Sequence, residues 1–110
     1  MIESEGRLIT QINIDEKRVA DFCRRWGVRE LAVFGSVLRD DFRPESDVDV
    51  LASFAPGARH TLFELGHMEA ELASIFGRKV ELVERDAVEK SENYIRRREI
   101  LNSARPIHVA

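Results

Sequence analysis

The segment from Phe34 to Val50 holds the residues whose types and spacing are best suited to chemistry. Gly35 lacks a side chain, so the backbone there can approach a ligand closely or take a positive φ. Ser36 adds a hydroxyl at the start of an expected helical turn, where free backbone N–H groups attract anions such as phosphate. Gly35-Ser36 therefore predicts a phosphate-binding turn. A plain strand-to-helix turn capped by Ser36 is the alternative.

Two carboxylates, Asp47 and Asp49, follow on one expected strand with a single residue between them. Because successive side chains of a strand alternate between its faces, both point the same way. Like charges held this close raise a pKa or recruit a cation, and magnesium prefers a few carboxylates together with waters and substrate phosphates. The pair beside a phosphate-binding turn predicts a magnesium site for phosphoryl or nucleotidyl transfer. Decoration of a surface strand is the alternative interpretation.

A third carboxylate would complete a two-metal arrangement by activating the incoming hydroxyl. Glu81 is the best candidate, because it lies centrally on the next expected strand, where an acid has no packing role. The alternation of that strand equally allows a solvated Glu81, so catalysis and solvation both stay open.

The scaffold expected around these residues begins with two helices. Apolar spacing predicts a first helix that follows a cap at Asp15, carries Cys23 and Trp26 on its core-facing stripe, and stops at Gly27. A second amphipathic helix is predicted between Thr61, which forms a capping box with Glu64, and Gly77. A last, weaker helix is expected from a cap at Ser91 to about Ser103.

Apolar runs predict strands over 31–34, 47–54 and 79–84, and a short edge strand over 107–109. Residues 1–14 read either as a short strand or as a cover for the core. The order helix, strand, turn, strand, helix, strand, helix favours an α/β (α+β) fold, in which helices flank a mixed β-sheet of three to four or more strands.

The combined motif resembles that of the polymerase-beta-type nucleotidyltransferase superfamily, and it consists of Gly35-Ser36, Arg39, Ser46-Asp47 and Asp49. Within that superfamily, the short chain is similar to the minimal nucleotidyltransferases, which occur as antitoxin partners of HEPN-domain proteins. The core motif covers residues 34–51, and the order of elements extends the resemblance over about 15–103.

The resemblance implies a nucleotidyltransferase fold and a set of site residues. The nucleoside triphosphate, ATP, would be bound by Gly35, Ser36, Arg39 and Ser46. Two Mg²⁺ ions and the catalytic step would depend on Asp47, Asp49 and Glu81. Glu81 departs from the family, whose third carboxylate is usually an Asp. An ordinary surface ion pair is the alternative role for Arg39.

The implied activity is Mg²⁺-dependent transfer of a nucleoside monophosphate, most simply AMP from ATP, to a hydroxyl of a protein. The protein would act as the antitoxin of a HEPN toxin–antitoxin pair. The alternative is a non-catalytic antitoxin that neutralises a HEPN ribonuclease by binding it. A glycosyltransferase using Asp-x-Asp is disfavoured, because the chain is too short for a nucleotide-sugar domain.

Length and composition set the remaining expectations. The 110 residues fit one domain, 1–110, and a formal net charge of −3 argues against bulk nucleic-acid binding. One cysteine excludes an internal disulfide. Without an apparent leader or membrane span, the expected location is the cytoplasm, and small size favours a homo-oligomer or hetero-oligomer. The run Arg96-Arg97-Arg98 reads as a solvated helix face or, alternatively, as a contact for a phosphate or an acidic partner.

Overall fold

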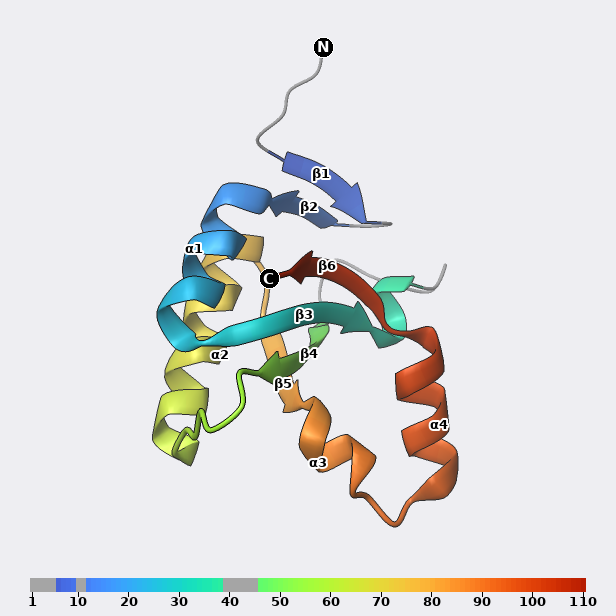
Figure 1. The fold of residues 1–110 in the computed structure, drawn as a ribbon. Coiled ribbons are helices and arrows are strands. Elements are labelled where there is room, and N and C mark those ends of the chain that lie inside the picture. The colour runs from blue at the N-terminus through green and yellow to red at the C-terminus, as the bar shows by residue number, and fades with distance from the viewer. Residues whose placement is uncertain (1–5, 10–11, 39–45) are drawn as a thin grey trace.

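The computed structural model describes residues 6–9, 12–38 and 46–110. A short 3₁₀ turn, η1, follows the third strand (Figure 1). The elements in chain order are β1 (Gly6–Ile9), β2 (Ile12–Asp15), α1 (Glu16–Trp26), β3 (Val28–Phe34), η1 (Gly35–Leu38), β4 (Val48–Phe54), α2 (Leu62–Phe76), β5 (Val80–Glu84), α3 (Arg85–Glu89), α4 (Tyr94–Ser103) and β6 (Arg105–Val109).

The central sheet has four strands in the order β5-β4-β3-β6. β3 pairs antiparallel with both β4 and β6, whereas β4 and β5 run parallel and are joined through α2. β1 and β2 form a separate antiparallel hairpin. The mixed sheet flanked by helices confirms the predicted fold class, and the hairpin resolves the ambiguity of residues 1–14 within the described part of that segment.

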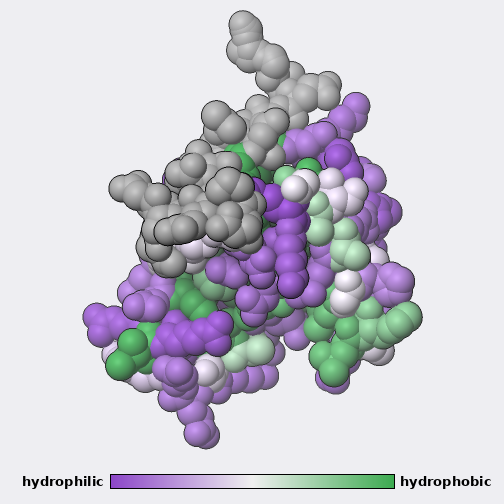
Figure 2. All heavy atoms as spheres, turned by 180° about the vertical axis from the view of Figure 1, so that it is seen from behind, coloured by the Kyte–Doolittle hydropathy of each residue, from purple (hydrophilic) through white to green (hydrophobic). Residues whose placement is uncertain are grey.

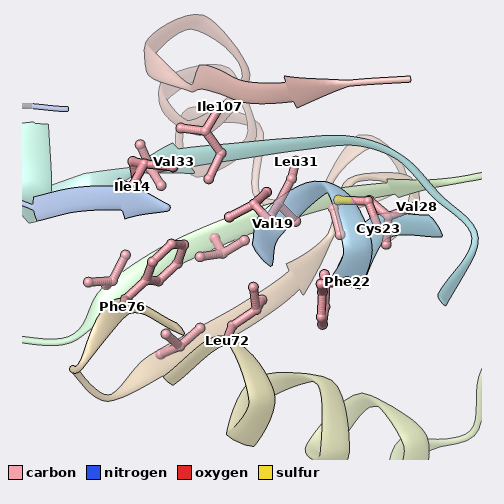
Figure 3. Close-up of a cluster of buried hydrophobic side chains, with 14 of the residues drawn as sticks. Ile14, Val19, Phe22, Cys23, Val28, Leu31, Val33, Leu72, Phe76 and Ile107 are labelled. Carbon is pink, nitrogen blue, oxygen red and sulfur yellow. The ribbon is translucent and has the colours of Figure 1, made fainter. Parts of the chain in front are cut away.

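Helices cover both faces of the sheet, because its central strands are apolar on both sides. Val33 and Val50 belong to a core cluster packed with α1 and α2, whereas their neighbours Phe34 and Leu51 join Val88 and Ile100 of α3 and α4 in a second cluster. Figure 3 shows side chains from α1, α2 and β3 meeting in the first cluster, among them Val19, Leu72 and Leu31.

The predicted ends of α1 and α2 are confirmed. The Asp15 side chain accepts a hydrogen bond from the Arg18 backbone N–H, and Gly27 ends α1 in the left-handed region at φ +72°. Thr61 and Glu64 form the reciprocal capping box at the start of α2. Gly77 ends α2 at φ +69°. These ends are set by local hydrogen bonds, which the sequence alone can indicate.

The start of the last helix was predicted wrongly. α4 is capped by Asn93, whose side chain accepts from the Arg96 backbone N–H at 3.1 Å. Ser91 instead accepts from the Asn93 backbone N–H, also at 3.1 Å. Two residues with cap-forming side chains lie close together here, and Ser91 stabilises the turn that leads into the cap. The short helix α3 was not predicted.

The junction between α1 and α2 is polar and partly exposed. Trp26, predicted to lie in the core, is half-buried, and its Nε1–H donates to Glu71 Oε1 at 3.0 Å. Arg25 reaches across to the same carboxylate and forms an ion pair with it. Cys23 is buried in the first cluster, as predicted, and burial raises the pKa of its thiol to about 12.

No helix among the described residues combines the length and the apolar character that crossing a bilayer would require.

Candidate active site

The candidate site lies where β3 ends and β4 begins. Asp49 of β4 lies opposite Phe34 of β3 on one side and opposite Glu81 of β5 on the other. The two carboxylates, Asp49 and Glu81, are therefore direct neighbours across a parallel strand pair. Asp47 precedes β4 by one position, so the predicted strand begins one residue too early.

Gly35 makes room for the Asp49 carboxylate. The backbone at Gly35 has φ +78°, which side chains rarely allow. A Cβ atom at this position would also collide with Asp49 Oδ2 and would lie 3.2 Å from Asp49 Cγ. Both constraints demand glycine, so the turn after β3 brings its backbone directly against the carboxylate.

The electrostatic surroundings raise the pKa of Asp49 to about 6. Burial is the largest cause, because it penalises the charged carboxylate. Repulsion from and hydrogen bonding with Glu81, and repulsion from Asp47, add to the effect, whereas Arg96 opposes it. A bound cation would offset both the cost of burying the charged carboxylate and the repulsion between the carboxylates. This is the behaviour expected of a metal ligand.

An open pocket of about 680 Å³ adjoins this carboxylate. Its walls come from the end of β3, the η1 turn, α4 and β6. The lining residues are Phe34, Gly35, Ser36, Leu38, Asp49, Arg96, Glu99, Ile100, Ser103 and Arg105. The pocket is large enough to enclose a substantial part of a nucleotide-sized ligand.

Two arginines border the pocket, Arg96 from α4 and Arg105 from β6. Neither guanidinium group forms an ion pair with another described residue. For Arg96, a phosphate contact was predicted from sequence only as an alternative to a solvated helix face. It offered no signal for Arg105, whose place depends on the pairing of β6 with β3.

The predicted site residues are brought together to different degrees. Gly35, Ser36 and Asp49 share the pocket, with Asp47 and Glu81 close enough to Asp49 to affect its pKa. Ser46 directly precedes Asp47, and its backbone carbonyl accepts a hydrogen bond from Arg78 Nη1 at 3.1 Å. Arg39 lies outside the described residues. The roles assigned to all of these residues stay predictions.

The donor set fits magnesium better than a metal held by protein alone. Within the described ranges, no three His, Cys, Asp or Glu side chains are arranged to hold a metal ion by themselves. Magnesium commonly uses one or two carboxylates and completes its shell with waters and substrate phosphates. A carboxylate of raised pKa beside an open pocket provides that kind of partial site.

Comparison with known families shows the class of the protein. The model of the nucleotidyltransferase domain family matches residues 16–107, which include every described element from α1 to α4 and part of β6. The chain belongs to this family and is a nucleotidyltransferase.

Two archaeal relatives carry more specific names. A protein of Methanocaldococcus jannaschii, named a protein adenylyltransferase, is 28% identical over 72 residues, which are 66% of this chain and 75% of the relative. The protein adenylyltransferase MntA of Thermococcus cleftensis is 39% identical over 59 residues, which are 54% of this chain and 58% of the relative.

Solved structures share the fold. A minimal nucleotidyltransferase superposes with a TM-score of 0.63 at 29% identity, over 84% of this chain and 88% of that chain. A toxin–antitoxin structure with AMP-PNP gives 0.65 at 15% identity, over 88% and 75%. The complex of an AMPylated Shewanella oneidensis HEPN toxin with its MNT antitoxin gives 0.57 at 15%, over 86% and 70%. At 15% identity the likeness concerns the fold alone.

Proposed function

We propose that this nucleotidyltransferase is a protein adenylyltransferase that transfers AMP from ATP to a hydroxyl of a HEPN-domain toxin and acts as its antitoxin. The contact of Gly35 with the Asp49 carboxylate in the wall of an open pocket carries the proposal, because a carboxylate of the type that Mg²⁺ prefers lies beside a turn suited to phosphate. The names of the two archaeal relatives and the AMPylated toxin in the Shewanella complex support the choice of acceptor.

Each of the site residues has a separate role in the proposed reaction. Asp47 and Asp49 would hold magnesium, which would neutralise charge on the triphosphate. Backbone N–H groups of the turn at Gly35 and Ser36 bind phosphate oxygens. The acceptor oxygen forms a bond to the α-phosphorus of ATP while the bond to the β-phosphate oxygen breaks, so pyrophosphate leaves with the electron pair. Glu81 accepts the proton of the acceptor hydroxyl.

Mass spectrometry tests the proposal directly. The protein is incubated with a candidate HEPN partner, Mg²⁺ and each nucleoside triphosphate in turn, and the intact mass of the partner is recorded. A gain of one or more AMP units, which is absent when the Asp47→Ala, Asp49→Ala double variant is used, supports adenylyl transfer. A gain in mass only with another nucleoside triphosphate would show that the transferred nucleotide is not AMP. No gain with any nucleotide would reject transfer to that partner.

A non-catalytic antitoxin is the second candidate, and the surroundings of Glu81 are the observation that favours it. Glu81 is exposed and replaces the shorter Asp that the family usually carries. Asp47→Asn separates the two functions, because it removes a metal ligand without adding bulk. The variant should still bind the partner, and it should lose protection against the toxin only if transfer is required.

We also propose that residues 1–110 form one domain, since both core clusters share the same four-stranded sheet. An ATP-dependent reaction on a toxin fits the cytoplasm, where ATP is available. Assembly with the toxin as a hetero-oligomer follows from the proposed activity.

A further inference from the structure

Helix α4 presents apolar side chains in two directions. Ile100 is buried in the second core cluster, at 6% exposure. Tyr94 and Ile95, six and five residues earlier, face outward at 57% and 72% exposure. Large apolar side chains exposed to water are unfavourable, so two of them in sequence on one helix indicate a surface that binds a partner.

A shallow groove of about 450 Å³ runs along this outer face of α4. It is lined by Tyr94, Ile95, Arg98, Glu99, Asn102 and Ser103. Glu99 and Ser103 also line the pocket beside Asp49. The groove therefore adjoins the pocket that holds Asp49, and the side chains of Glu99 and Ser103 lie between the two.

The charge of α4 indicates what kind of polypeptide fits. Of the charged residues of the helix, only Arg98 and Glu99 line the groove, and Glu99 also lines the pocket beside Asp49, so Arg98 is the charge that belongs to the groove alone. Arg97 is partly engaged, because it donates to the Ser91 carbonyl at 2.8 Å and lies over the Tyr94 ring. Arg98 lies along the groove and contacts the Tyr94 hydroxyl at 3.4 Å.

We propose that the α4 groove, defined by these six lining residues, is the docking surface for the acceptor protein, which presents an apolar segment for Tyr94 and Ile95 and an acidic residue for Arg98. The inference rests on the proposed function for its occupant. A transferase that modifies a protein needs a surface of this kind beside its centre, since a pocket that holds the nucleotide cannot by itself select a macromolecule. Tyr, Ile and Arg also supply the aromatic, aliphatic and cationic anchors that protein interfaces concentrate.

A second exposed apolar patch provides an internal control. Leu62 and Phe63, at the start of α2, are 87% and 77% exposed. Figure 2 shows hydrophobic atoms gathered at the lower right over this part of α2, and a smaller group at the lower left over α4. α2 follows the far end of β4 from Asp49, and seven strand residues span about 20 Å. This patch shares no lining residue with the pocket.

The test compares Ile95→Asp with the matched variant Phe63→Asp, since both introduce a charge at an exposed apolar position. Binding of AMP-PNP with Mg²⁺ is measured first by calorimetry and should be unchanged in both, which also shows that each variant is folded. Complex formation with the HEPN partner is then measured. Ile95→Asp should weaken it at least tenfold, and Phe63→Asp should change it less than twofold. Arg98→Glu should weaken it as well, and Arg98→Lys should largely retain it.

The outcomes separate the docking surface from the proposed transfer reaction. If Ile95→Asp alone breaks the complex while the unaltered protein adds no AMP, the surface stands and the transfer proposal fails. If Ile95→Asp binds as tightly as the unaltered protein, or Phe63→Asp weakens binding equally, the surface is wrong. Failure of the unaltered protein to bind the HEPN partner would overturn the choice of occupant.

Discussion

Asp49 is the residue on which the neighbouring elements converge. The Gly35 backbone lies against it, Glu81 lies beside it across a strand pair, and Arg96 is near enough to lower its pKa. Each neighbour comes from a different part of the chain. Changes at Asp49 and Gly35 should therefore affect stability and activity in separable ways.

Replacement of Gly35 by alanine should abolish transfer and destabilise the fold. The added Cβ would collide with Asp49 Oδ2, and alanine disfavours φ +78°. We expect a loss of about 1–3 kcal/mol in the free energy of unfolding, as for strained backbone sites. Urea unfolding measures the stability, and intact-mass analysis of the partner measures transfer. Gly57→Ala is the control, because it has a similar φ of +84° but no atom near its Cβ.

Replacement of Asp49 by asparagine should abolish transfer yet stabilise the metal-free protein at neutral pH. The pKa of Asp49 is raised in the folded state, so the penalty for its charge is fully present above about pH 6 and absent below the unfolded value. Removing this charge should raise the free energy of unfolding by about 1 kcal/mol, a value that is reduced because solvent screens a half-buried carboxylate.

The pH dependence identifies the cause of that gain. The melting temperatures of the two proteins should differ at pH 7.5 and converge as the pH falls below about 4. Added Mg²⁺ should raise the melting temperature of the unaltered protein more than that of Asp49→Asn. An equal melting temperature at pH 7.5 would contradict the proposed penalty.

Among the elements, α4 brings Arg96 to the pocket, and strand β6 brings the second arginine, Arg105. Arg96 lines the pocket, whereas Arg98, two residues further on, lines only the outer groove. We expect Arg96→Ala to weaken binding of AMP-PNP with Mg²⁺ at least about tenfold, because a charge-assisted contact to phosphate contributes roughly 1.5–3 kcal/mol. Arg98→Ala should leave that affinity within twofold. Equal losses in calorimetry would place the nucleotide elsewhere.

The junction of α1 and α2 stabilises the layer of helices behind the sheet. Glu71 accepts hydrogen bonds from Trp26 and Arg25, which lower its pKa, with Arg25 the larger cause. Glu71→Gln should cost about 1 kcal/mol at pH 7. Because a lowered pKa stabilises the fold above the unfolded value of 4.5, the difference should shrink as the pH falls below 4.5 and through the lowered pKa of the folded state. Thermal unfolding at pH 7 and pH 3.5 checks this, with transfer unchanged at pH 7.

At the scale of the whole molecule, Cys23 reports on opening of the core. It is 1% exposed, and its thiol has a pKa of about 12, so it is both inaccessible and protonated at neutral pH. An aromatic disulfide reagent should react with it only through unfolding, several orders of magnitude more slowly than in denaturant. Fast labelling of the folded protein would show that the first core cluster opens readily.

Much of the fold could be predicted from the sequence, because the informative signals are local. The Thr61 capping box and the glycines that end α1 and α2 depend on a few neighbouring residues. The resemblance to the family could also be predicted, because the Gly-Ser and Asp-x-Asp motifs are short runs of neighbouring residues. The predicted cap at Ser91 was wrong, because Asn93, two residues later, caps the helix instead.

The remaining features are set by contacts between distant segments. The sequence predicts Glu81 in the middle of a strand, but its position opposite Asp49 depends on the register of β5 against β4. The arrival of Arg96 and Arg105 at the pocket depends on how α4 and β6 return to the sheet. Apolar periodicity indicates which face of a helix or strand is buried, but it does not indicate which helices and strands pack against each other.

Because β4 and β5 pair in parallel, the length of the connection through α2 determines which residues of the two strands lie opposite each other. Asp49 and Glu81 lie opposite each other only because the chain leaves β4, passes through a helix fixed at both ends, and re-enters the sheet in one register. A single residue inserted after Gly77 would shift that register and turn Glu81 toward the first core cluster. Length variation between these strands is therefore constrained at the α2–β5 junction, and the loop before Thr61 is the place where this enzyme can lengthen without separating its carboxylates.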